Sequence, residues 1–108
     1  MQQRASQING CAFCMHMHAG DARKVGVPDE VLDTLAGWRE APWFSERERA
    51  ALAWTERLTR LSEPMDDSRE YDRLATHFTE KERTDLTYVI AMINVWNRFS
   101  VGFRREPE

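Results

Sequence analysis

Apolar residues recur along this sequence at intervals of three or four positions, which places them along one side of an α-helix. The pattern is most extended near the end of the chain, where a helix after Thr79 is predicted to continue to about Phe103. A helix that is apolar on two sides is buried over most of its surface, so we expect one side to meet another subunit. Its two stripes consist of Leu86, Ile90, Ile93, Asn97 and Val101, and of Tyr88, Met92, Val95 and Phe99.

Turn residues divide the first part of the chain into two further helices. The segment Ile8-Asn9-Gly10 is a turn signal, and a helix is predicted from near Cys11 to about Val25. Gly26 follows as the residue just past its end, where a left-handed backbone is easiest. Pro28 fits the first turn of the next helix. The apolar side of that helix consists of Val31, Leu32 and Leu35, and the helix is expected to end near Gly37.

Two capping boxes mark later helix starts. Ser45 pairs with Glu48 and Thr79 pairs with Glu82, so that each side chain satisfies a free backbone N–H of the other residue. The stretch 38–44 before the first box is predicted to be a loop. The helix after it is expected to stop at Pro64, with Leu52, Leu58 and Leu61 on roughly one side.

Asp67 is predicted to cap a short helix whose apolar stripe is Tyr71, Leu74 and Phe78. No segment has the alternating pattern of a strand. The predicted fold class is therefore all-α, with a single domain over residues 1–108.

The composition fits a small soluble domain with a thin core. The chain has 108 residues, of which 42% are hydrophobic, and 15 basic against 18 acidic residues leave a net charge of −3. This dispersed, mildly acidic charge disfavours nucleic acid and anionic membranes as partners, and it weighs against a helix-turn-helix DNA-binding role. No apolar run approaches the ~20 residues of a membrane span, and no signal-peptide pattern precedes Ala5, so a cytoplasmic location is expected.

The two cysteines carry the clearest chemical signal. Cys11 and Cys14 are separated by two residues at a predicted helix start, where free N–H groups and the helix dipole favour a thiolate and are expected to lower the thiol pKa. His18 follows Cys14 by four positions and so lies on the same helix face, where it can take the thiol proton. His16 projects elsewhere and is the weaker candidate.

Two other interpretations of this segment remain open. The cysteines could be structural thiols that pack as small apolar side chains. Cys11, Cys14 and His18 could also supply three zinc ligands with His77 as a distant fourth, although a closed zinc site usually uses two local ligand pairs and no second pair exists. A redox dithiol is the preferred interpretation.

The sequence resembles the AhpD-like alkylhydroperoxidases of the carboxymuconolactone decarboxylase superfamily over almost its whole length. The most specific part is the Cys-x-x-Cys-x-x-x-His core within the run from Arg4 to His18. The other matching segments are Asp21-Ala22-Arg23, Trp38-Arg39, residues 44–54, His77-Phe78, Asp85-Leu86-Thr87 and residues 93–98.

This resemblance implies an all-helical bundle that assembles as trimers or hexamers and a thiol-dependent peroxidase without haem, flavin or metal. It assigns Cys14 as the attacking thiolate, Cys11 as the thiol that resolves the sulfenic acid into a disulfide, and His18 as the group that helps to deprotonate Cys14. The helix-start argument alone could favour Cys11, but the register of His18 selects Cys14. A dihydrolipoyl-type or other dithiol protein is the implied reductant.

The sequence departs from the family pattern at two positions. The peroxidase members carry a glutamate twelve residues before the first motif cysteine, and that position falls upstream of Met1, so the N-terminal helix is expected to be shortened. The residue before the second cysteine, which can be histidine in those members, is Phe13. These departures motivate an alternative function, a non-catalytic redox-responsive or structural helical oligomer. Lactone decarboxylation is disfavoured because that branch generally lacks the dithiol.

Overall fold

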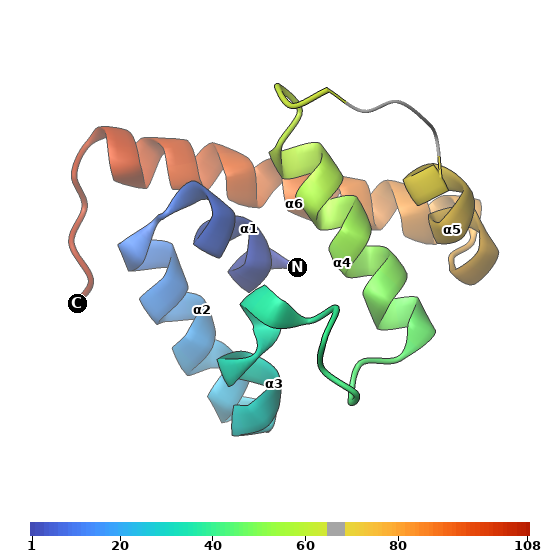
Figure 1. Cartoon of the computed structure of the whole chain (residues 1–108). Helices are drawn as coiled ribbons and strands as arrows, with labels where there is room; N and C mark the ends of the chain where they lie inside the picture. The colour runs from blue at the N-terminus through green and yellow to red at the C-terminus, as the bar shows by residue number, and fades with distance from the viewer. Residues whose placement is uncertain (65–68) are drawn as a thin grey trace.

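The computed structural model describes residues 1–64 and 69–108, and every regular element in these two ranges is helical. The α-helices are α1 (Gln2–Asn9), α2 (Ala12–Lys24), α3 (Asp29–Asp33), α4 (Glu46–Thr59), α5 (Arg69–His77) and α6 (Glu80–Gly102), with a 3₁₀ turn η1 at Leu35–Gly37. In Figure 1, α6 spans the length of the molecule, and α1 lies between it and the helices below. Because α1 packs against α2, α4 and α6, it is the centre of the bundle.

The capping signals account for the helix starts. Ser45 with Glu48 and Thr79 with Glu82 form complete capping boxes at the first turns of α4 and α6. The predicted span of α2 is also confirmed, with Cys11 as its N-cap. The end of α6 at Gly102 agrees with the prediction as well.

Two stretches differ from the predicted elements. Helix α4 ends at Thr59, before Pro64, because the chain turns at Arg60. Leu61 therefore lies outside the helix, where it is 66% exposed rather than part of an apolar side. The helix predicted after Pro28 is split into α3 and η1. Asp67, predicted to cap α5, lies outside the described residues.

Helix α1 corresponds to the N-terminal helix that the family resemblance implied, but the hydrophobic pattern did not predict it, and its composition explains why. The side that it buries carries Arg4, Ala5 and Ser6. A buried face made of one cation, one hydroxyl and one methyl has no apolar period that could reveal it. Gly10 adopts the left-handed conformation with φ of 67° and turns the chain from α1 into α2.

The two stripes of α6 have different environments. Ile90, Ile93 and Asn97 of the first stripe are buried. Val101, predicted to continue that stripe, is exposed because the buried side continues through Ser100 instead. Of the second stripe, Tyr88, Val95 and Phe99 are exposed on the single chain. Assembly of several chains through this face stays a prediction that sedimentation equilibrium would test.

Candidate functional site

Cys11 and Cys14 lie where α1, α2 and α6 meet. Cys11 is the extended N-cap residue of α2, and its Sγ accepts a hydrogen bond from the backbone N–H of Cys14 at 3.3 Å. The Cys14 side chain extends from the first turn of α2 toward α6. Both cysteines are only 1% exposed and belong to one buried cluster with Ala5 of α1 and Ile93 of α6. The structure thus places the two cysteines together in a buried setting, as free thiols.

A polar network surrounds the thiol of Cys14. Its Sγ donates to Ser100 Oγ at 3.8 Å, a distance within hydrogen-bonding range for sulfur. One turn earlier on α6, Asn97 donates to Ser6 Oγ at 3.1 Å and accepts from Asn9 Nδ2 at 2.9 Å. Asn97 is itself buried. Buried polar groups that satisfy one another hold a single arrangement, so this network fixes α1 against α6 next to Cys14.

The pKa of the Cys14 thiol differs in direction from the sequence-based expectation. Burial raises this pKa, and the hydrogen bond with Cys11 adds to the increase. Hydrogen bonding between Cys14 and the side chains of Asn97 and Ser100 lowers the pKa but does not compensate for these two effects. The expectation of a lowered pKa at the helix start was therefore wrong for Cys14, because loss of water outweighs the effect of the helix N-terminus.

His18 lines the same cavity as Cys14, one turn further along α2. Its Nε2 atom is buried and finds no hydrogen-bond partner among the described residues. Burial lowers the pKa of His18 below its ordinary value of 6.5. The imidazole is therefore neutral near pH 7 and is able to accept a proton.

The cavity beside Cys14 has a volume of about 300 Å³, at the lower end of the range for small-molecule sites. Most of its wall is apolar, and the polar groups Ser100 and His18 lie near the thiol. The apolar lining residues are Phe13, Met17, Ile93 and Trp96, and Gln2 and Arg105 complete the wall. An apolar molecule with one reactive polar group therefore fits this space better than a fully polar one.

The remaining histidines lie apart from this site. His16 is exposed on α2, as its spacing from Cys14 predicted. His77 ends α5, which packs against α4 and α6. Across residues 1–64 and 69–108, no three histidine, cysteine or acidic side chains are grouped closely enough to hold a metal ion. His77 is thus not brought together with Cys11, Cys14 and His18.

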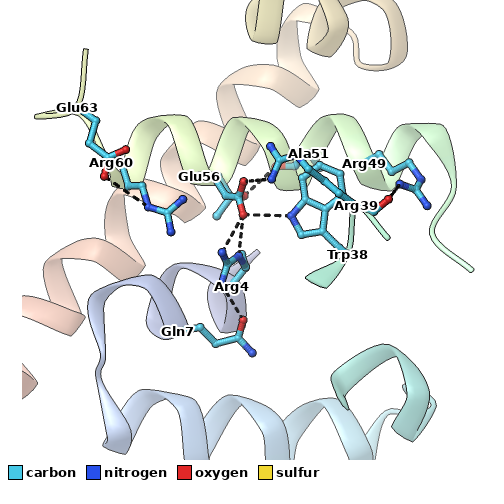
Figure 2. A network of polar contacts seen from close by, with 10 residues as sticks. Arg4, Gln7, Trp38, Arg39, Arg49, Ala51, Glu56, Arg60 and Glu63 are labelled. Atoms are coloured by element: carbon cyan, nitrogen blue, oxygen red, sulfur yellow. Dashed lines mark hydrogen bonds and ion pairs between the residues drawn. The ribbon is translucent and has the colours of Figure 1, made fainter. Parts of the chain in front are cut away.

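A buried ion-pair network supports α1 from the opposite side (Figure 2). Glu56 of α4 accepts hydrogen bonds from Arg4 Nε at 2.9 Å and from Trp38 Nε1 at 3.2 Å through Oε2. Arg39 donates to its other oxygen at 2.5 Å. Burial alone would raise the pKa of Glu56, but the bonds from Arg39, Arg4 and Trp38 outweigh it, so the pKa is lowered. The carboxylate therefore stays charged and anchors α1.

Comparisons with known proteins place this chain in a family. The model of the carboxymuconolactone decarboxylase family matches residues 1–57. The chain is 40% identical over 99 residues to the uncharacterized protein YdfG of Bacillus subtilis, and 35% identical over 98 residues to the uncharacterized protein YnjA of Escherichia coli. It spans 67% of the former and 53% of the latter. The chain belongs to the carboxymuconolactone decarboxylase family.

A similar solved structure describes the fold of this chain more specifically than the family does. A protein of unknown function from Agrobacterium tumefaciens, described as a candidate antioxidant defence protein AhpD, superposes with a TM-score of 0.95 at 38% identity. The alignment covers 99% of this chain and 73% of the other. The fold is therefore AhpD-like, as the resemblance implied. In the described ranges 1–64 and 69–108, no helix is long and apolar enough to cross a membrane.

Proposed function

We propose that this protein is a thiol-dependent peroxidase that reduces organic hydroperoxides through Cys14 and Cys11. The observation that carries the proposal is the cavity itself, in which the Cys14 thiol and the neutral imidazole of His18 face the same largely apolar space. The AhpD-like fold supports the proposal, since the Agrobacterium protein has been described as a candidate antioxidant defence protein. A reducing compartment such as the cytoplasm suits a dithiol that must be regenerated.

In the proposed reaction, the hydroperoxide oxidises the dithiol in two displacement steps. His18 accepts the Cys14 proton as the sulfur attacks the terminal peroxide oxygen, the O–O bond breaks, and the departing alkoxide takes the proton and leaves as an alcohol. Cys14 is then a sulfenic acid. The Cys11 sulfur attacks it, a disulfide forms and water leaves. A dithiol donor of the dihydrolipoyl type then reduces the disulfide and is itself oxidised to a disulfide.

The raised pKa of Cys14 and the lowered pKa of His18 define the resting state of this proposed mechanism. Both groups are neutral near pH 7, because the charged thiolate–imidazolium pair is disfavoured by burial. The thiol is therefore protected until a peroxide enters the cavity and proton transfer accompanies attack.

The first test is the intact mass and free-thiol count of the reduced protein before and after one equivalent of tert-butyl hydroperoxide. We expect rapid loss of both thiols with a mass decrease of two hydrogens and no crosslink between chains. Thiols that remain unreacted would contradict the peroxidase proposal.

The burial of the dithiol favours a second candidate function, a redox-responsive or structural oligomer without turnover. At 1% exposure and with a raised pKa at Cys14, the thiols could change state slowly and report oxidation by altering the packing of α1 against α6. Steady-state hydroperoxide reduction with excess dithiothreitol separates the two candidates. Sustained turnover identifies the peroxidase, and a single slow oxidation identifies the sensor.

The variant His18→Gln tests whether His18 is the base that accepts the Cys14 proton. If His18 accepts the Cys14 proton during attack, its loss should slow the oxidation of Cys14 by hydroperoxide at pH 7 by about 10²-fold, since the neutral imidazole is the proposed base. The measurement is the rate of Cys14 oxidation by tert-butyl hydroperoxide in a Cys11→Ser background. His16→Gln is the matched control, because His16 is exposed on the same helix. Identical rates for the two variants would remove His18 from the mechanism.

A further inference from the structure

The chain after α6 bends back toward the dithiol. Phe103 caps the helix, and Arg104 adopts a left-handed conformation with φ of 58°, which is uncommon for a residue with a side chain. The N–H of Arg105 then donates to the carbonyl oxygen of Ser100 at 2.8 Å. This closure resembles the hydrogen bond that glycine-terminated helices use. Figure 1 shows the segment turning from the end of α6 toward the start of α2.

The turn places the Arg105 guanidinium over the ring of Phe13, 3.8 Å from its centroid. Phe13 stands between the two cysteines in the sequence, so this stacking fixes a cation beside the dithiol. Of the described residues that line the cavity, Arg105 alone carries a permanent charge, and none is acidic. The cavity therefore combines an apolar wall, a reactive thiol and one cationic edge.

The donors of Arg105 are weakly engaged within the chain. Its ion pair with Glu108 is long, at 4.0 Å, and the two side chains are 57% and 84% exposed. A pair at this separation in water contributes little, so an anion in the cavity competes with it easily. Five N–H groups in a planar fork also match the two oxygens of a carboxylate.

We propose that the substrates of this site are organic hydroperoxides that carry a carboxylate, with the carboxylate on Arg105, an apolar body along Phe13, Met17 and Trp96, and the peroxide at Cys14. This inference rests on the proposed peroxidase function and adds the substrate class. Uncharged alkyl hydroperoxides react at the same thiol but without the contact to Arg105. Phe13 stands where related peroxidases can carry histidine, and this inference gives the residue a role, because the Arg105 guanidinium stacks on its ring.

Binding without turnover is the decisive experiment. 4-Isopropylbenzoate and its uncharged isostere 4-isopropylbenzamide are titrated into the reduced protein, and dissociation constants are taken from NMR chemical shifts. We expect the benzoate to bind about 5-fold more tightly, the size of a partly exposed ion pair. Arg105→Gln should abolish that preference. Arg104→Gln is the matched control, since it removes an adjacent positive charge that does not line the cavity, and it should preserve the preference.

The same comparison with reactive compounds separates this inference from the function on which it rests. Cumene hydroperoxide and its 4-carboxy derivative are reacted with wild-type and Arg105→Gln protein, and thiol loss is followed. Oxidation by both compounds without a carboxylate preference in either assay overturns the substrate class and leaves the peroxidase intact. Oxidation by neither compound overturns the peroxidase function, and the substrate assignment falls with it.

Discussion

Cys14→Ser should abolish hydroperoxide turnover, with a loss of more than about 10³-fold in kcat/KM. The hydroxyl of serine occupies nearly the same space and can keep the contact with Ser100, so the fold should remain intact. Serine cannot form a sulfenic acid, however, so Cys11 has no sulfenic acid to attack. The measurement is hydroperoxide consumption with dithiothreitol as the reductant.

Cys11→Ser provides the matched control for this loss, because the two variants should fail at different steps. Without Cys11, Cys14 should still be oxidised once, and its sulfenic acid should be trapped by dimedone. Cys14→Ser protein should give no such adduct. If dimedone instead labels Cys11 in the Cys14→Ser protein, the two roles are exchanged. Sustained turnover by Cys14→Ser would remove the dithiol mechanism altogether.

The sequence predicted those parts of the fold that depend on local signals. The capping boxes at Ser45 and Thr79 located two helix starts, since the paired side chains lie within one turn and need no tertiary information. The inner side of α6 was predicted for the same reason at Ile90 and Ile93. Helix α1 was expected only from the family resemblance. The residue pattern did not predict it, because its buried face includes Arg4, whose burial depends on the carboxylate of Glu56 on another helix.

The candidate site was predicted only along α2. Cys11, Cys14 and His18 share one helix, so their register followed from spacing, whereas Ser100 lies 86 positions from Cys14 and joins it only through packing. A polar pair at Asn97 and Ser100 within an otherwise apolar stripe was the one available signal. Arg105 had none, because its position depends on a left-handed turn at a residue other than glycine. The direction of the Cys14 pKa was missed for a related reason, since desolvation is a property of the assembled helices.

The second large effect is expected at Glu56, where the change Glu56→Gln should lower the free energy of unfolding by about 3 kcal/mol at pH 7. The Arg4 and Glu56 side chains are each 9% exposed, so removal of the negative charge leaves the Arg4 guanidinium buried without its counterion. Urea unfolding followed by circular dichroism measures the loss. Asp85→Asn is the control, because its ion pair with Lys81 is exposed, and it should leave the free energy of unfolding nearly unchanged.

The pH dependence of this effect has a definite sign. The folded protein lowers the pKa of Glu56 below its ordinary value of 4.5, so the carboxylate contributes its full stabilisation above that pH and loses it as the pH falls through the lower folded value. The difference between wild type and Glu56→Gln should therefore be constant near neutrality and shrink below about pH 4.5. A difference that persists unchanged at pH 3 would show that glutamine disturbs packing rather than charge. Because Ala5 of α1 shares one buried cluster with Cys11 and Cys14, the same variant should speed alkylation of Cys14, which links the ion pair to the protection of the dithiol.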